Sequence, residues 1–173
     1  MNKLGQFDNP VIMFAIIVIG LLLIAPIGLK IMRSIQAPMS TALGNVSNGG
    51  QVAQTNFNKV INTGINFWDK VIVSLFVLAI ILLFVSAFLV DAHPFFILLY
   101  VLLNLFLILF APNIIEAVDK IYDSSTFAQE TTMLVFMNTI RLHYVGFLIG
   151  IMVITGIIIY GKIALFGGGG NRR

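Results

Sequence analysis

Two apolar runs separated by a short polar break constrain the fold of this chain more than any other feature. The runs cover residues 71–90 and 95–111, and the break holds Asp91, His93 and Pro94. Asp91 and His93 are the only acidic or basic residues of this region. Since an α-helix rises about 1.5 Å per residue, each run can cross a hydrocarbon core of about 30 Å. The pattern therefore predicts a transmembrane helical hairpin.

The composition of the whole chain supports a membrane protein. Of its 173 residues, 59% are hydrophobic and 10% are charged, whereas soluble domains carry about 25% charged residues. A soluble protein of this length could not bury so much apolar surface. The absence of cysteine excludes disulfides, thiolate metal sites and cysteine nucleophiles. The formal net charge of +3 suits contact with anionic lipid headgroups or phosphates.

The N-terminal part, residues 1–33, predicts a further transmembrane helix. Residues 11–29 carry no charge. Pro26, near the end of this run, is expected to kink or halt the last turn. Lys30 and Arg33 follow as cations that can anchor the helix at the lipid headgroups.

Residues 34–70 form a polar connector rich in Ser, Thr, Asn, Gln and Gly. Its second half carries a stripe of apolar residues at helical spacing: Phe57, Val60, Ile61, Ile65 and Trp68. We expect an amphipathic helix that lies at the membrane surface and runs into the second span, with Trp68 and Lys70 as interface anchors. A solvated loop is the alternative, because Gly64 interrupts the stripe.

The segment after the hairpin, residues 112–126, predicts a second amphipathic surface helix. Pro112 should end or bend the third span. The apolar side of the segment consists of Ile114, Ile115, Val118, Ile121 and Tyr122, and the wet side of Glu116, Asp119, Lys120 and Asp123.

Residues 127–166 contain no proline and predict one long C-terminal helix of about 60 Å, twice the bilayer core. Its uncharged part, residues 144–161, is the fourth span. A Gly-rich basic tail, residues 167–173, ends in Arg172 and Arg173 and should act as a flexible tether with a basic tip.

The expected fold is therefore an all-α integral membrane protein. It has about four transmembrane helices, two amphipathic surface helices and one long C-terminal helix. Four spans place both termini on one side of the membrane, but the distribution of cations does not decide which side.

Three residues inside the predicted spans are candidates for helix packing. Gly146 and Gly150 form a GxxxG pattern, whose small residues let a neighbouring helix approach closely, either within one chain or between copies. Asn104 lies in the middle of the third span and should face protein, since an unpaired amide in hydrocarbon costs several kcal/mol. We expect an interhelical hydrogen bond there rather than a pore or ion site.

Few residues offer catalytic or metal-binding chemistry. Arg141 and His143 precede the fourth span without metal-ligand spacing, and Arg141 is expected to anchor the interface by facing headgroups, Glu130 or Asp123. The usual signatures of hydrolases, phosphate-binding loops and dinucleotide-binding folds are missing. We therefore expect no enzyme activity, no metal and no cofactor.

The short chain, the polar connector, the two surface helices and the basic tail at residues 167–173 resemble the small integral proteins of membrane-containing tailless icosahedral phages. The resemblance concerns the makeup of the whole chain and transfers no functional residue. It implies a non-enzymatic protein of the virion inner membrane whose partners are lipid and capsid proteins. The basic tail would then contact the capsid interior or, weakly, the phosphates of packaged nucleic acid.

Three classes of function are compatible with these observations. The first is a structural protein that packs in a protein-rich membrane, of a virion or a cell, and anchors a neighbouring shell or complex. The second is a pore-forming, holin-like homo-oligomer associating through Gly146 and Gly150, and the third is a small transporter or an accessory subunit of a membrane complex. A pore predicts a polar stripe along one helix, and a transporter predicts broken helices with polar centres. The predicted spans have neither, which favours the structural protein.

Overall fold

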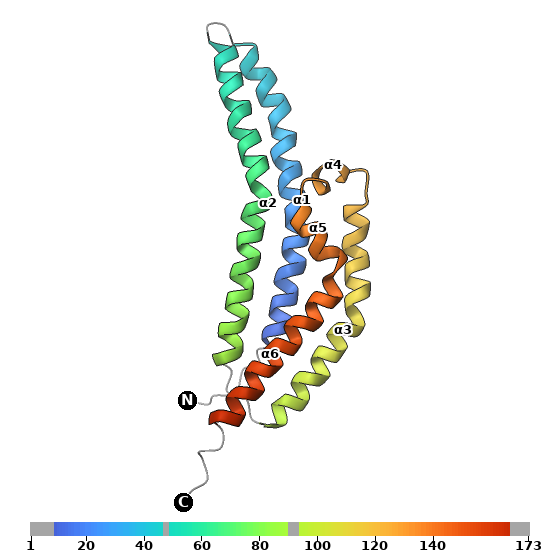
Figure 1. Ribbon diagram of the computed structural model, residues 1–173. Coiled ribbons are helices and arrows are strands. Elements are labelled where there is room, and N and C mark those ends of the chain that lie inside the picture. The colour runs from blue at the N-terminus through green and yellow to red at the C-terminus, as the bar shows by residue number, and fades with distance from the viewer. Residues whose placement is uncertain (1–8, 47–48, 90–93, 167–173) are drawn as a thin grey trace, which may run out of the picture. The chain divides into compact units, whose positions relative to one another are not determined.

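The computed structural model describes residues 9–46, 49–89 and 94–166, and these form helices and no strand (Figure 1). The helices are α1 (Pro10–Gly44), α2 (Gly50–Leu89), α3 (Pro94–Tyr122), α4 (Ala128–Thr131), α5 (Val135–Leu142) and α6 (Tyr144–Phe166). Among them α1, α2, α3 and α6 are long and apolar enough to cross a membrane. The expected all-α fold with four helices of spanning length is thereby confirmed.

The helices belong to two compact units. Among the described residues, the first unit consists of residues 9–19, 76–89, 94–116 and 143–166, and the second of residues 20–46, 49–75 and 117–142. Three of the long helices, α1, α2 and α3, contribute residues to both units.

The core of the first unit is built from one face of each long helix. Buried residues recur at intervals of three and four: Val11, Phe14 and Val18 on α1; Phe76, Ala79, Leu83 and Ala87 on α2; Tyr144, Leu148, Ile151, Thr155 and Ile159 on α6. The rings of Phe14, Phe76 and Phe147 join three of these helices, with centroid distances of 6.0 Å from Phe14 to each of the others and 5.3 Å between Phe76 and Phe147. Such contacts add about 1 kcal/mol each to the burial of the rings.

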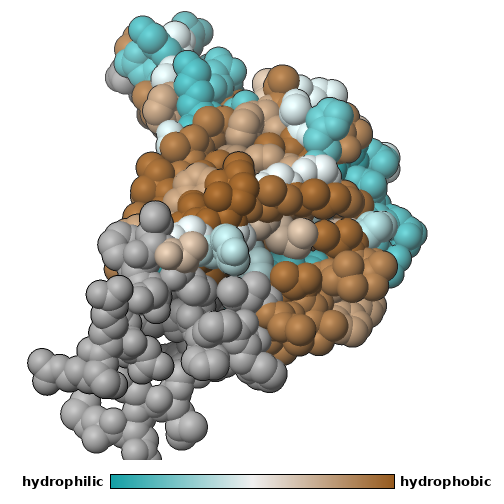
Figure 2. All heavy atoms as spheres, turned by 60° about the horizontal axis from the view of Figure 1, so that its bottom comes forward, coloured by the Kyte–Doolittle hydropathy of each residue, from teal (hydrophilic) through white to brown (hydrophobic). Residues whose placement is uncertain are grey.

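The same helices direct other large apolar side chains outward. Ile16 is 64% exposed on α1, Leu82 55% on α2, Leu109 63% on α3 and Ile157 65% on α6. Figure 2 shows the resulting broad hydrophobic areas in brown. Exposed apolar surface of this extent is unfavourable in water and suits a lipid environment.

The second unit contains an antiparallel hairpin formed by residues 20–44 of α1 and residues 50–75 of α2 (Figure 1). Gly49 adopts φ +100, a left-handed conformation that glycine tolerates, just before α2 begins. Side-chain hydrogen bonds join the two arms: Gln36 Nε2 donates to Asn62 Oδ1 at 3.1 Å, and Asn58 Nδ2 donates to Ser40 Oγ at 2.9 Å.

The hairpin decides between the two expectations for the second half of residues 34–70. The polar connector is helical on both sides of its turn, and the stripe from Phe57 to Trp68 belongs to α2, which continues without a break into the apolar run that begins at Val71. The expected helix that runs into the second span is therefore present, and the alternative of a loop is wrong for this stripe. The reason is tertiary: within the hairpin Ile65 is buried and Phe57 and Trp68 are half-buried, so a neighbouring helix covers apolar side chains that would otherwise need lipid.

Of the two outcomes expected at each proline, an end of the helix is excluded. α1 passes through Pro26 and Pro38, and α3 passes through Pro112. Packing on both sides of Pro26 offsets the local cost of about 3 kcal/mol, because Ala25 and Leu29 are buried there.

The second predicted amphipathic segment is the end of α3 rather than a separate helix. Its two faces are as predicted, since Val118 and Tyr122 are buried whereas Glu116 and Asp123 are exposed. Because this face is buried in the second unit, α3 continues past Pro112 and ends at Tyr122.

The expectation of one long helix over residues 127–166 is wrong. The chain forms α4, α5 and α6 there. Between α4 and α5 the Thr132 hydroxyl donates to the Gln129 carbonyl at 2.8 Å, and the Leu134 amide bonds to Thr131 at 3.2 Å, which are local bonds that compete with a regular helix. Leu134 and Met137, which follow this break, are both fully buried.

Candidate functional site

The predicted interface anchors Lys30, Arg33, Trp68, Lys70 and Arg141 all fall in the second unit. Lys30, Arg33 and Trp68 contact segments that the sequence alone did not associate with them, Arg141 contacts Asp123 as the sequence suggested, and Lys70 is exposed. The contacts fall into three groups: a cluster around Glu130, a contact of Trp68 with α1, and a cluster around Arg141.

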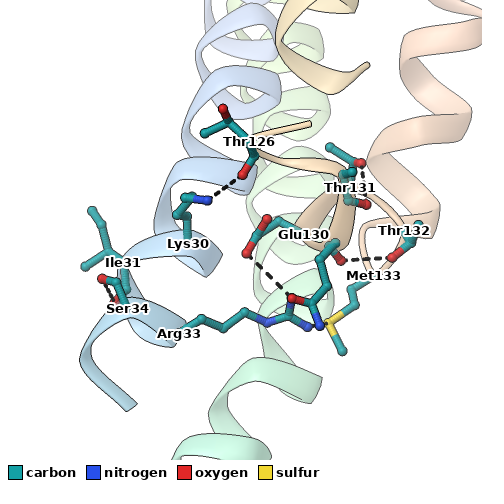
Figure 3. Close-up of polar contacts among 11 residues, drawn as sticks. Lys30, Ile31, Arg33, Ser34, Thr126, Glu130, Thr131, Thr132 and Met133 are labelled. Carbon is teal, nitrogen blue, oxygen red and sulfur yellow. Dashed lines mark hydrogen bonds and ion pairs between the residues drawn. The ribbon is translucent and has the colours of Figure 1, made fainter. Parts of the chain in front are cut away.

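Arg33 on α1 reaches Glu130 on α4. The distance from Nη1 to the Glu130 carboxylate is 3.5 Å, and Nη2 donates to the sulfur of Met133 at 2.8 Å (Figure 3). Glu130 is only 4% exposed, so its carboxylate depends on this cation for compensation. The guanidinium of Arg33 donates no strong hydrogen bond to another described side chain. Thioether sulfur is a weak acceptor, and Nη1 is buried without a hydrogen-bond acceptor among the described residues.

Lys30 lies one turn before Arg33 on α1. Its amino group donates to the carbonyl of Thr126 and lies 5.5 Å from the centroid of the Phe127 ring. Figure 3 shows Lys30 and Arg33 approaching the α4 region from the same helix, with Glu130 between them. Glu130 forms its ion pair with Arg33, whereas Lys30 bonds to the backbone of Thr126.

A cavity of about 490 Å³ opens beside Arg33. Its polar lining consists of Arg33 and the side-chain amides of Gln36, Asn62, Asn66 and Gln129, and Ile65 and Met133 complete it. The lining is supplied by α1, α2 and the α4 region, at helical spacings such as 33 and 36 or 62 and 66. The sequence did not predict this cavity, because no pattern along the chain indicates that the polar faces of these three segments meet.

Arg141 on α5 binds the end of α3. Its Nη1 lies 3.0 Å from Asp123 and 3.2 Å from Asp119, and its guanidinium lies 5.0 Å from the centroid of the Tyr122 ring. Of the two acidic partners that the sequence suggested, Asp123 is the one in contact, while Glu130 pairs with Arg33.

Asp69 lies two residues before the apolar run of α2. Burial raises the pKa of its carboxyl above the usual range, and a backbone hydrogen bond from Phe136 lowers it in part.

Asn104 is fully buried in the first unit. Its Nδ2 donates to the Tyr100 carbonyl of its own helix at 2.8 Å, and Oδ1 has no donor among the described residues. The hydrogen bond between helices comes instead from the Tyr100 hydroxyl, which donates to the Met152 carbonyl of α6 at 3.1 Å. Asn104 thus faces protein, as expected, but the hydrogen bond across helices is donated by Tyr100 rather than by Asn104.

Gly146 and Gly150 lie on an uncovered face of α6. A methyl group added at either position would meet nothing within 4 Å. Within one chain, therefore, the GxxxG pattern does not serve as a contact between the described helices.

The described residues contain no group of three or more His, Cys, Asp or Glu side chains that could hold a metal. Asp91, His93, Arg172 and Arg173 lie outside the described residues. No protein-family model, curated protein or solved structure matches this chain.

Proposed function

We propose that this chain is a non-enzymatic, multi-pass structural membrane protein whose α1–α2 hairpin projects from the bilayer and anchors a neighbouring shell or complex. Insertion is supported by four helices of spanning length that carry large exposed apolar side chains. A virion inner membrane is the proposed location, on the resemblance of the chain to phage membrane proteins.

The observation that carries the proposal is the length of the hairpin beyond its apolar runs. Residues 30–44 of α1 and 50–70 of α2 extend about 22 Å and about 31 Å past the predicted spans. A hairpin that long exceeds the headgroup layer of a bilayer. Its outer side carries Ile35 and Met39, which are 52% and 49% exposed and occupy one face of α1.

A partner surface on this face would bury those side chains together with the amide-rich residues around them. Capsid-type or other membrane proteins are the proposed partners, and the basic tip at Arg172 and Arg173 is a second proposed contact, toward a protein or nucleic-acid phosphates.

The test is cross-linking mass spectrometry of the native particle or membrane, with Ile35→Glu/Met39→Glu compared with Gln51→Glu/Asn56→Glu. Both pairs lie at exposed positions of the hairpin and add the same charge. Loss of cross-links to a partner protein only in the first pair would support the proposal. A discrete homo-oligomer without any partner would contradict it and favour the pore-forming alternative.

A further inference from the structure

We infer that the cavity beside Arg33 binds the phosphate of a phospholipid headgroup. The inference rests on membrane insertion of α1 and α2, as proposed above, but not on the proposed protein partner.

The height of the cavity along the two helices matches the headgroup layer. Arg33 follows Leu29, the end of the first uncharged run, by about 6 Å of helix, and Asn66 precedes Val71 by about 8 Å. The headgroup regions add roughly 5–7 Å to each side of the hydrocarbon core. Both helices therefore bring their polar lining to the depth at which lipid phosphates lie.

The chemistry of the cavity suits a phosphate. Arg33 lines the cavity, and its Nη2 atom donates to the thioether sulfur of Met133, a weak acceptor, while Nη1 is enclosed 3.5 Å from the Glu130 carboxylate. A phosphate oxygen would supply the charged acceptor that a guanidinium fork binds best. Amides of Asn66 and Gln129 provide further donors, and Ile65 and Met133 offer apolar contacts to the start of the acyl chains.

The neighbouring charges favour an anion. Arg33 lines the cavity and Lys30 lies one turn earlier on α1, whereas Glu130 is the one carboxylate paired with Arg33 (Figure 3). Glu130 acts in two ways: it holds Arg33 in place and it competes with the phosphate for the same guanidinium.

The test is native mass spectrometry of the full chain reconstituted in phosphatidylcholine nanodiscs that contain phosphatidylglycerol. The readout is the phospholipid retained after release from the disc. We expect Arg33→Gln to lose retained lipid about tenfold, and the exposed, charge-matched control Lys59→Gln to retain it. Glu130→Gln should retain more lipid than the wild-type chain, because the competing charge is gone. A purely structural role for Arg33 predicts no gain in that variant.

Unchanged retention in Arg33→Gln would overturn the inference. If Arg33→Gln fails to fold, Asn66→Leu replaces it as the test variant, because residue 66 is exposed and lies outside the ion pair. The inference then requires that Asn66→Leu reduce the amount of retained lipid. Added inorganic phosphate is also tested as a competitor. If it displaces the lipid and phosphate adducts appear instead, the ligand is free phosphate, and the inference of a lipid headgroup is overturned. Alkaline extraction of each variant from membranes tests insertion separately, so failure of insertion is distinguishable from failure of lipid binding.

Discussion

The indole ring of Trp68 on α2 lies so close to Gly28 on α1 that a methyl group at residue 28 would collide with its Cζ2 atom. The indole Nε1 also donates to the Ala25 carbonyl at 3.0 Å, which fixes the ring over this turn. Glycine is needed at residue 28 because nothing larger than a hydrogen atom fits beneath the ring.

Gly28→Ala should therefore destabilise the protein although alanine favours helices by about 1 kcal/mol. Overpacking against a held ring costs about 1–3 kcal/mol, so we expect a net loss of about 1 kcal/mol and a change in tryptophan emission. Trp68 is the only tryptophan, so thermal unfolding followed by its fluorescence reports the effect directly. Gly20→Ala, where nothing lies within 4 Å, should be neutral or stabilising. Unaltered emission and stability in Gly28→Ala would show that the ring lies elsewhere.

Arg141 should tolerate lysine poorly. Lysine keeps the charge but lacks the planar guanidinium, which lies over the Tyr122 ring while its Nη1 atom contacts both carboxylates. We expect Arg141→Lys to lower the free energy of unfolding by about 1 kcal/mol, measured by thermal unfolding in detergent. Lys59→Arg, at an exposed position of α2, serves as the control and should leave stability unchanged. Equal stability of both variants would mean that charge alone accounts for the contact.

Asn104→Leu should maintain or raise stability. The Oδ1 atom is buried without a donor among the described residues, so leucine removes a polar atom that costs about 1–3 kcal/mol at similar volume. Asn104→Asp, which buries a charge instead, should lower it strongly. Thermal unfolding of both variants decides the matter, and a marked loss in Asn104→Leu would reveal an unrecognised partner of the amide.

Gly146→Leu with Gly150→Leu should weaken association between copies while leaving the single chain folded. Both positions have open space around them, so the larger side chains block only a second helix. A membrane two-hybrid assay measures the association, with Gly20→Leu as a control at another open glycine. Full association of the double variant would remove these glycines from any interface between copies.

The sequence by itself determined the helical class and the four apolar segments, because uncharged runs such as residues 71–90 have few other ways to satisfy their backbone in lipid. It also determined the two faces of residues 114–122, which follow from helical periodicity.

Only the tertiary structure decided where the helices end and which polar residues meet. α1 passes through Pro26 because Trp68 packs against the turns around it, and α2 remains helical through its polar part because Gln36 and Ser40 bond to it. The cavity beside Arg33 joins three segments up to 100 residues apart in the chain, as the Arg33–Met133 contact illustrates. Periodicity reports the face of one helix, whereas contacts between helices depend on packing that no local pattern contains.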